Sequence, residues 1–491
     1  MRKTNAYWLV LLGLVFAAII LPLFIFLPSQ REHADPWTFL PERPPHTDHS
    51  SLMKGPFPDG PSVTEACLAC HQEAAHQVMQ TSHWTWESQP VTLPGHDEPV
   101  RLGKKNAINN FCIGIRSNWP PCTACHAGYG WEDAQFDFKQ EKNVDCLVCH
   151  DNSGTYSKGN AGFPKEDVDL VSAAQSVGGP TRANCGTCHF RGGGGNAVKH
   201  GDLDESLYFP SERIDVHMGK YKFLCTDCHQ SQDHNMKGKA ISVSFDDENQ
   251  VACTDCHAPN LHKDDRINSH VASVACQSCH IPSSAKQHAT KTHWDWSAAG
   301  EDIPEDPHVY LKKKGRFEYQ KDLLPEYSWY NGLADHYILG DPINPDTITV
   351  ITSPRGDISD PDAKIWPFKV HRARQIYDAE NNYLIQPKTV GKGGYWTDFD
   401  WDKAARLGSE AVGLEYSGHY GFTDTEMFWP ITHMVSGKEE ALQCVDCHGE
   451  SPRARMNWEQ LGYPGDPIYY GGRQLDRTGK LSNAGGGRHV N

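Results

Sequence analysis

The sequence has few of the apolar residues that normally build a protein interior. Only 38% of its 491 residues are hydrophobic, a thin supply for a chain whose length alone suggests two or three domains. It also lacks an excess of positive charge, because 46 lysines and arginines stand against 62 acidic residues, for a net charge of −16. This balance argues against nucleic acid as a partner.

Cysteines outside one repeated motif are almost absent. Eight times a cysteine is followed three residues on by a second cysteine with a histidine directly behind it, which uses sixteen of the seventeen cysteines. C-x-x-C-H is the attachment sequence of c-type haem, in which two thiols bind the porphyrin and the histidine ligates the iron. In chain order the motifs hold Cys67, Cys70 and His71; Cys122, Cys125 and His126; Cys146, Cys149 and His150; Cys185, Cys188 and His189; Cys225, Cys228 and His229; Cys253, Cys256 and His257; Cys276, Cys279 and His280; and Cys444, Cys447 and His448.

Two other uses of these cysteines are less suitable. Structural zinc sites do not require a histidine behind every second cysteine, and chains that depend on a disulfide framework are short. Eight covalently attached haem c groups would also supply the apolar core that the side chains lack. We therefore expect a mainly α fold with extensive irregular loops, a multihaem cytochrome c fold organised around a chain of haems, with little β structure.

The N-terminus carries a candidate membrane segment. Residues 7–27 are uncharged, follow Arg2 and Lys3, and are long enough to span a bilayer. No small-x-small cleavage site precedes the polar residues that come next, which favours an uncleaved anchor over a cleaved signal peptide. Either reading places the bulk of the chain on the periplasmic side of the membrane.

The motifs divide the rest of the chain unevenly. Seven lie before residue 281, and the eighth follows a gap of 168 residues that is rich in tryptophan. We expect this gap to form mixed helix and loop over the haems, with solvated helix faces at 311–316 and 402–406. The expected segments are a cytoplasmic tip at 1–6, the anchor or signal peptide at 7–27, a linker at 28–60, a core at 61–300, a covering region at 301–430, and the eighth motif with the tail at 431–491.

The remaining histidines are candidates for the second ligand of each iron. Nineteen of the 27 histidines lie outside the motifs, enough to ligate every iron twice, so counting alone leaves an enzyme and an electron conduit both open. We assign His33, His46, His49, His371 and His489 to the surface or to loops. The candidate second ligands are His83, His200, His217, His234, His262, His270, His293 and His433, eight histidines for about seven places.

Several long segments resemble one known family. Residues 145–164, 184–207, 431–449 and 455–467 resemble the octahaem tetrathionate reductases, relatives of hydroxylamine oxidoreductase and pentahaem nitrite reductase, and the resemblance extends from about Cys67 to Pro467. It implies seven haems with two histidine ligands each and one catalytic haem with a lysine ligand.

The resemblance also assigns the catalytic lysine. The matching residue is Lys158, on the haem of the second motif, with His126 displaced from the iron; Lys165 is the nearby competitor. To bind iron the lysine amine must lose its proton, which burial beside a metal favours.

The resemblance implies a reductase that takes electrons from a donor cytochrome or a quinol-linked protein. The expected substrate is a small inorganic molecule: tetrathionate, cleaved to thiosulfate, or else nitrite or hydroxylamine. The alternatives are a membrane-tethered conduit with every haem doubly ligated, or the oxidation of hydroxylamine or hydrazine.

Three further expectations concern the surroundings of the haems. Lys199, Lys220 and Lys222 are candidates for a basic funnel, with solvated lysines as the simpler reading. Cys112 is a pocket thiol or a small buried hydrophobe. Carboxylates near Asp145 and Asp151 are candidates for proton delivery or for holding a calcium ion.

Overall fold

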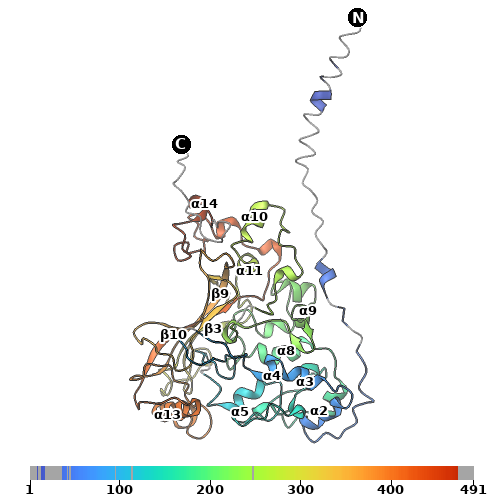
Figure 1. Cartoon of the computed structure of the whole chain (residues 1–491), viewed down its shortest axis with the longest axis vertical. Helices are drawn as coiled ribbons and strands as arrows, with labels where there is room; N and C mark the ends of the chain where they lie inside the picture. Colours follow the sequence, from blue (N-terminus) through green and yellow to red (C-terminus); the bar gives the residue numbers. More distant parts are fainter. Residues whose placement is uncertain are drawn as a thin grey trace.

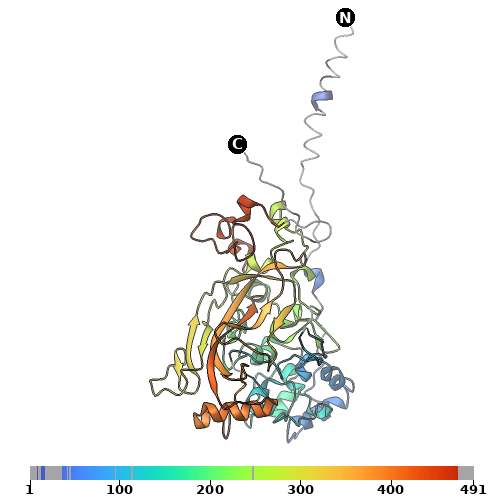
Figure 2. The same ribbon diagram turned by 60° about the vertical axis from the view of Figure 1, so that its left-hand side comes forward.

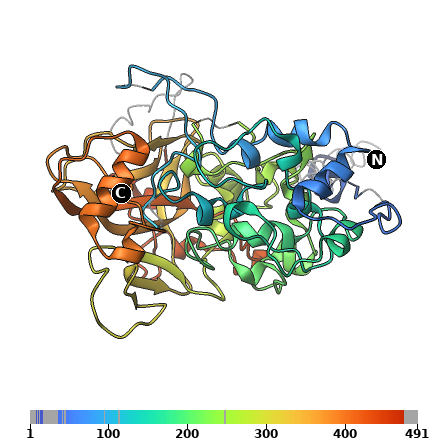
Figure 3. The same cartoon turned by 90° about the horizontal axis from the view of Figure 1, so that it is seen from below.

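The computed structural model describes residues 8, 11, 13–16, 36–40, 42–43, 46–93, 95–111, 114–245 and 248–473. The haem-motif region and a β-sheet lie side by side, which is clearest in the view from below (Figure 3). Cys112 and most of the candidate membrane segment at 7–27 lie outside the described residues. Within the described part of the chain, no helix combines the length and apolar character needed to cross a membrane.

The motif region consists of short helices joined by irregular loops, as expected. Its α-helices are α2 (Gly60–Leu68), α3 (Ala74–Met79), α4 (Ser82–Thr85), α5 (Trp119–Cys122), α6 (Leu147–His150), α7 (Leu170–Gln175), α8 (Arg182–His189), α9 (Cys225–Cys228), α10 (Asp265–His270) and α11 (Cys276–His280). Shorter helical turns are η1 (Pro36–Phe39), η2 (Thr123–Cys125), η3 (Glu141–Asn143), η4 (Asn160–Gly162), η5 (Glu205–Leu207), η6 (Val216–Lys220), η7 (Ile241–Val243) and η8 (Cys253–Asp255). A small hairpin joins β1 (Ser231–Gln232) to β2 (Asn235–Met236).

The expectation of little β structure is wrong, because an eight-stranded sheet fills most of the region expected to be helix and loop (Figure 2). Seven strands run in the order β4-β5-β3-β9-β10-β8-β7, and β6 also pairs with β9. The strands are β3 (Thr290–Asp295), β4 (Tyr310–Leu311), β5 (Gly315–Gln320), β6 (Glu326–Tyr330), β7 (Ala334–His336), β8 (Thr349–Pro354), β9 (Lys364–Asp378) and β10 (Tyr420–Pro430).

The two long strands explain why the sheet forms. β9 and β10 pair antiparallel over eleven residue positions, from Tyr420↔Asp378 to Pro430↔Phe368. Between His371 and Gln375, buried residues alternate with exposed arginines, the period-two pattern of a strand. Charged residues 311–316 form the β4–β5 hairpin instead of a helix.

Most tryptophans of this region belong to the largest apolar core of the described residues. Trp294 and Trp296 stack with ring centroids 4.3 Å apart, and both are fully buried beside Phe368. Offset aromatic stacking of this kind adds to the hydrophobic gain from burial. The sheet therefore supplies much of the side-chain core that the motif region lacks.

The remaining helices follow the sheet strands or the eighth motif. They are α12 (Tyr395–Asp398), α13 (Trp401–Val412), α14 (Pro467–Tyr470), η9 (Lys438–Glu440) and η10 (Cys444–Asp446). In α13, Asp402 and Arg406 form an exposed i, i+4 ion pair while Ala404 and Ala405 are buried, so 402–406 is a half-solvated helix, close to expectation.

The sheet and the motif region are joined through β9. Lys369 Nζ donates to the carbonyl oxygens of Val198 and Lys199 at 2.9 and 3.1 Å, just beyond the fourth motif. Ser278, inside the seventh motif, donates through Oγ to Ile365 O at 2.7 Å. These bonds attach the haem motifs to β9, a central strand of the sheet.

Part of the segment expected to be a linker packs on the motif region. Met53 is buried, and its carbonyl accepts a hydrogen bond from Gln175 Nε2 at 2.9 Å. Arg43 forms an ion pair with Asp227 at 2.5 Å. The described residues of this segment thus bring histidines from before the first motif close to it.

Candidate active site

The motif cysteines and histidines sit on single helical turns. α8 carries Cys185, Cys188 and His189, and α11 carries Cys276, Cys279 and His280. Positions three and four residues apart lie on one face of a helix. α8 and α11 each therefore present two thiols and one imidazole on the same side, the arrangement that covalent haem attachment needs.

Seven motif histidines lie opposite a second histidine, and the distance between the two rings is nearly the same in all seven pairs. Their ring centroids are separated by 6.1 to 6.4 Å. The pairs are His49–His71 at 6.3 Å, His83–His189 at 6.2 Å, His150–His234 at 6.4 Å, His217–His257 at 6.1 Å, His229–His433 at 6.2 Å, His262–His280 at 6.2 Å and His270–His448 at 6.3 Å.

This separation fits a metal ion between the two rings. A metal–imidazole bond is about 2 Å long, so two imidazoles on opposite sides of one metal have centroids roughly 6 Å apart. The spacing is too wide for ring stacking in contact, and it recurs in seven pairs drawn from unrelated segments. The donor set and the spacing therefore fit haem irons with two histidine ligands.

The pairs change the set of second ligands expected from the sequence. Six of the eight candidates lie opposite a motif histidine, but among the described residues His200 and His293 do not. The His200 ring contacts Trp429 at 5.1 Å, and His293 lies in β3, in register with Arg372 of β9. His49, which we had assigned to the surface or a loop, lies opposite His71.

His371 is the second histidine that we had wrongly assigned to the surface or to a loop. It is fully buried in β9, and its Nδ1 lies 3.0 Å from Asn110 Oδ1. No described histidine of a motif pairs with it. Its burial follows from the sheet, which the sequence reading did not anticipate.

His126, the histidine of the second motif, departs from the pattern. Its Nε2 lies 2.7 Å from Trp84 O, and its ring packs among Trp84, Trp86, Trp131 and Phe136 at centroid distances of 4.9, 5.4, 4.7 and 5.4 Å. Burial lowers the pKa of His126 to about 3, so the ring is neutral. Among the described residues, no second histidine faces it.

Lys158 reaches the second motif from the loop after the third. Its Nζ donates to His126 O at 2.5 Å and to Gly128 O at 3.2 Å, and pairs with Asp145 Oδ2 at 2.7 Å. The Lys158 and Asp145 side chains are only 3% and 0% exposed. Lys165, the competitor, is exposed. The structure thus brings the lysine named by the family resemblance to the second motif, whose histidine faces no second histidine among the described residues.

Asp145 gathers the polar groups around Lys158. Tyr129 OH donates to Oδ1 at 2.8 Å, Tyr156 OH donates to Oδ2 at 2.9 Å, and Val148 N donates to Oδ1 at 3.0 Å. Burial raises the pKa of both tyrosines well above the usual value. A buried carboxylate with this many donors holds a fixed position and fixes its lysine partner with it.

A glycine allows the Lys158 loop to close. Gly162 has φ +80°, and a Cβ there would lie 2.2 Å from Gly128 O and 3.5 Å from Lys158 Nζ. Only glycine adopts this left-handed conformation without strain and leaves space for the carbonyl. The sequence reading did not identify Gly162, Tyr129 or Asp145 as a group, because they meet only in the fold.

Thiols of different motifs lie next to one another, which orders the motifs in space. These thiols lie close enough to shift one another's pKa, and the pairs join motifs one and three, two and four, four and five, six and seven, three and four, five and six, and seven and eight. In the same order, the pairs are Cys67–Cys146, Cys125–Cys188, Cys185–Cys225, Cys253–Cys276, Cys149–Cys185, Cys228–Cys256 and Cys279–Cys444.

Several other candidates do not form a site. Lys220 pairs with exposed Glu212 at 2.6 Å, Lys222 donates to Gly219 O, and Lys199 lies over Trp429 at 4.7 Å, so the three lysines make separate contacts. Within the described ranges, no group of three or more histidine, cysteine or acidic side chains converges to hold a lone metal ion. Neither a zinc centre nor a calcium site is therefore supported.

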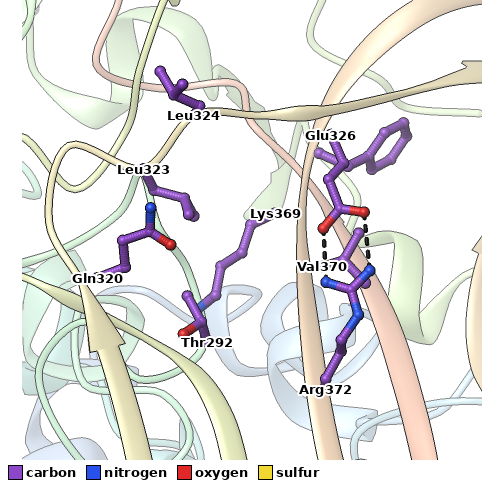
Figure 4. Close-up of a pocket in the computed structure, with 9 residues that line it drawn as sticks. Thr292, Gln320, Leu323, Leu324, Glu326, Lys369, Val370 and Arg372 are labelled. Atoms are coloured by element: carbon purple, nitrogen blue, oxygen red, sulfur yellow. Dashed lines mark hydrogen bonds and ion pairs between the residues drawn. The ribbon is translucent and has the colours of Figure 1, made fainter. Parts of the chain in front are cut away.

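A small cavity of about 80 Å³ lies on the sheet (Figure 4). Arg372 and Glu326 form a two-bond ion pair on one side of it, at 2.7 and 2.9 Å. On the other side, Lys369 Nζ is held by Thr290 Oγ1 at 2.6 Å in addition to its two carbonyl partners. No motif residue lines this cavity, so we assign it no role in the chemistry.

Comparisons with known proteins agree with this geometry. Residues 291–451 match the family described as bacterial cytochrome c. The chain is 50% identical to the octahaem cytochrome c from Shewanella oneidensis in its crystal structure, with a TM-score of 0.81, over 86% of this chain and 98% of that one. No curated protein matches.

The folded motifs and the comparisons define a multihaem c-type cytochrome, a carrier of electrons with covalently attached haem. The chain belongs to the octahaem cytochrome c family, as its resemblance to the octahaem tetrathionate reductases led us to expect.

Proposed function

We propose that this protein is a reductase in which electrons reach a catalytic haem at the second motif, bound by Cys122 and Cys125 and ligated by Lys158. The observation that carries the proposal is the contrast between motifs. Seven motif histidines face a second histidine, whereas His126 is turned into an aromatic cage and Lys158 reaches the same motif. Haem iron, when bound, supplies electron transfer and a coordination position for substrate.

The chain's own residues would prepare that site in two ways. The cage around His126 keeps its ring neutral and directed to Trp84 O, away from any position opposite a second ligand. Asp145 and its two tyrosines hold Lys158 Nζ within 2.5 Å of the second motif's backbone. Asp145 Oδ2 is also the nearest carboxylate to accept the proton that Nζ must release before it binds a metal.

We propose tetrathionate as the substrate, with nitrite and hydroxylamine as secondary ones. Two electrons added to tetrathionate break its central S–S bond and give two thiosulfate ions, a reaction that needs no proton. The electrons come from a donor cytochrome or a quinol-linked protein. The support is the family resemblance and the geometry at Lys158.

The location of the protein and the remaining ligands are part of the same proposal. A periplasmic protein held to the inner membrane through 7–27 suits covalent haem attachment, which takes place on that side in bacteria. His49, His83, His217, His234, His262, His270 and His433 are the proposed second ligands, each with the motif histidine opposite it. A calcium ion near Asp145 or Asp151 stays a prediction.

The competing function is a conduit in which all eight irons carry two histidines. The position of His126 favours the enzyme, because no described histidine is placed to serve the second motif. Oxidation of hydroxylamine or hydrazine is the other alternative, and it would require a covalent link between the catalytic haem and the protein.

The test compares steady-state reduction of tetrathionate, nitrite and hydroxylamine by the purified holoprotein, with reduced methyl viologen as the donor. The variants are Lys158→Ala and, as a matched control, Lys165→Ala on the same loop. We expect Lys158→Ala to lose tetrathionate reduction and to change the spectrum of one haem, with Lys165→Ala unaffected. Wild-type spectrum and turnover in Lys158→Ala would refute the assignment.

A further inference from the structure

Three segments meet at the eighth motif, far along the molecule from the second. His448 faces His270 of α10 with ring centroids 6.3 Å apart. Asp466, the residue that caps α14, accepts a hydrogen bond from His448 Nδ1 at 2.6 Å and from Gly449 N at 2.5 Å. α10 and α14 lie at one end of the molecule and α5, which carries Cys122, at the other (Figure 1).

These three neighbouring segments each expose large apolar side chains. Val445 lies within the eighth motif itself, and the others lie on α10 and α14. The exposed fractions are 46% for Ile267, 45% for Val445, 61% for Ile468, 72% for Tyr469 and 66% for Tyr470. Exposed apolar residues gathered in this way mark interaction surfaces, whereas single ones are ordinary.

The eighth motif is also a terminus of the motif order. Its cysteines Cys444 and Cys447 interact electrostatically with Cys279 of the seventh motif. From there the neighbours run through motifs six, five and four to the second motif, where Lys158 lies. The first motif ends the branch through motif three, but the described residues next to His49 and His71 expose only one large apolar side chain, Leu52.

The charges on α10 and just before it are balanced. On α10 and just before it, Lys263 and Arg266 accompany Asp264 and Asp265, all of them exposed. The four charges of α10 therefore do not themselves favour a strongly basic or a strongly acidic partner. Contact with an apolar surface around a redox group is then the main recognition available.

We propose that Ile267, Val445, Ile468, Tyr469 and Tyr470 form the docking surface for a small c-type cytochrome that presents an apolar face around its own exposed haem edge. Electrons from this donor enter at the eighth motif and travel along the motif order toward the second. The proposal rests on the proposed function, since it names the donor of that reductase. Electron-transfer complexes of this kind are small, about 1,200 Å² or less, and dissociate readily.

The test uses the whole holoprotein and exploits the reversibility of electron transfer. The protein is reduced with dithionite, desalted, and mixed in a stopped-flow instrument with an oxidised small monohaem c-type cytochrome of near-neutral charge. The variant is Tyr469→Glu with Tyr470→Glu, which places two charges in the apolar surface. The matched control is Phe209→Glu, because Phe209 is 95% exposed and belongs to a different part of the chain.

We expect the double glutamate variant to lower the second-order rate by about tenfold or more and the control to stay within about twofold of wild type. A double variant with Tyr469→Phe and Tyr470→Phe keeps the surface apolar and keeps the rate. Unchanged kinetics in the glutamate variant would overturn the proposal. So would sedimentation showing a dimer that the glutamate variant dissociates, because the surface would then bind a second copy of this chain.

The docking surface and the proposed function can fail independently of each other. Tetrathionate reduction driven by methyl viologen bypasses the docking surface, so the glutamate variant retains it. If wild-type protein fails to reduce tetrathionate with viologen while the cytochrome kinetics behave as expected, the proposed function fails and the docking surface stands. If wild-type protein reduces tetrathionate with viologen but the glutamate variant shows unaltered cytochrome kinetics, the docking surface fails and the proposed function stands.

Discussion

Lys158 Nζ and Asp145 Oδ2 lie 2.7 Å apart, and neither side chain reaches solvent. The pair joins the loop after the third motif to the residue just before that motif, and Lys158 extends on to the backbone of the second. Removing one member of a buried ion pair leaves an unpaired charge, which costs about 3–5 kcal/mol. The pair therefore bears on the stability of the second motif and on the ligation that we propose for it.

Replacement of Asp145 tests its role as the residue that positions Lys158. We expect Asp145→Ala to lower the unfolding temperature and to change the spectrum of a single haem, because Lys158 loses its carboxylate partner. Asp145→Asn keeps an oxygen for the tyrosine hydroxyls and should have a smaller effect on both. Electron paramagnetic resonance and thermal unfolding measure the two consequences. A destabilised protein with an unaltered spectrum would show that Asp145 acts only on folding.

Replacement of His49 tests the correction to the set of second ligands. His49→Ala should convert one low-spin haem to a form that binds added imidazole, since His71 would lose the ring opposite it. His293→Ala should leave all the haems unchanged, because His293 lies in β3 and faces no motif histidine among the described residues. If His293→Ala alters a haem and His49→Ala does not, the original sequence-based assignment is right.

Replacement of Gly162 tests the closure of the Lys158 loop. Gly162→Ala should cost about 1–2 kcal/mol for the left-handed backbone and should also displace the loop from Gly128 O, changing the spectrum of the second haem. Gly154→Ala is the matched control, because Gly154 has φ +74° on the same loop with open space at its Cβ position. Equal spectral effects in the two variants would argue against the close contact at Gly162.

The pH dependence of stability tests the burial of Lys369. Burial lowers the pKa of Lys369 to about 7, whereas a lysine in an unfolded chain titrates near pH 10.4, so between these values the unfolded chain holds the extra proton. The contribution of Lys369 to the free energy of unfolding is fully present above about pH 10. This contribution is lost as the pH falls toward 7, by up to about 1.4 kcal/mol per pH unit.

The measurement for Lys369 is the difference in unfolding temperature between wild type and Lys369→Met across pH 7 to 9. The difference should widen as the pH rises, because the variant lacks the titrating amine. Lys321→Met, at an exposed position, should run parallel to wild type. A Lys369→Met curve that is also parallel would mean that the amine keeps an ordinary pKa inside the sheet.

Motif spacing predicted the chemistry of this chain better than its composition predicted the fold. C-x-x-C-H is local, since one helical turn places both thiols and the imidazole, and the family resemblance pointed to Lys158, whose role as a ligand stays a prediction. We did not predict the sheet because we expected the haems to supply the apolar core that the composition lacks. The segment that forms β9 was therefore interpreted as helix and loop, although its apolar and polar residues alternate. Once the sheet is known, the burial of His371 follows from its place in that strand.

The second ligands show where sequence reasoning ends. His83 comes soon after His71 of the first motif in the sequence, at a spacing that is common in multihaem cytochromes. The structure nevertheless places it opposite His189 of the fourth motif. His49 lies in a polar, proline-rich segment with no sign of order, and its position beside His71 depends on contacts such as that of Met53 with Gln175. Pairings between distant segments are decided by the packing of the whole motif region, which no local pattern encodes.

The measurement that tests the account most directly is electron paramagnetic resonance of the fully oxidised wild-type holoprotein, compared with Lys158→Ala. The account predicts seven irons with two histidine ligands in both proteins, and one distinct iron in wild type whose signal changes in the variant. Eight irons with two histidine ligands in wild type, and an identical spectrum in Lys158→Ala, would contradict it.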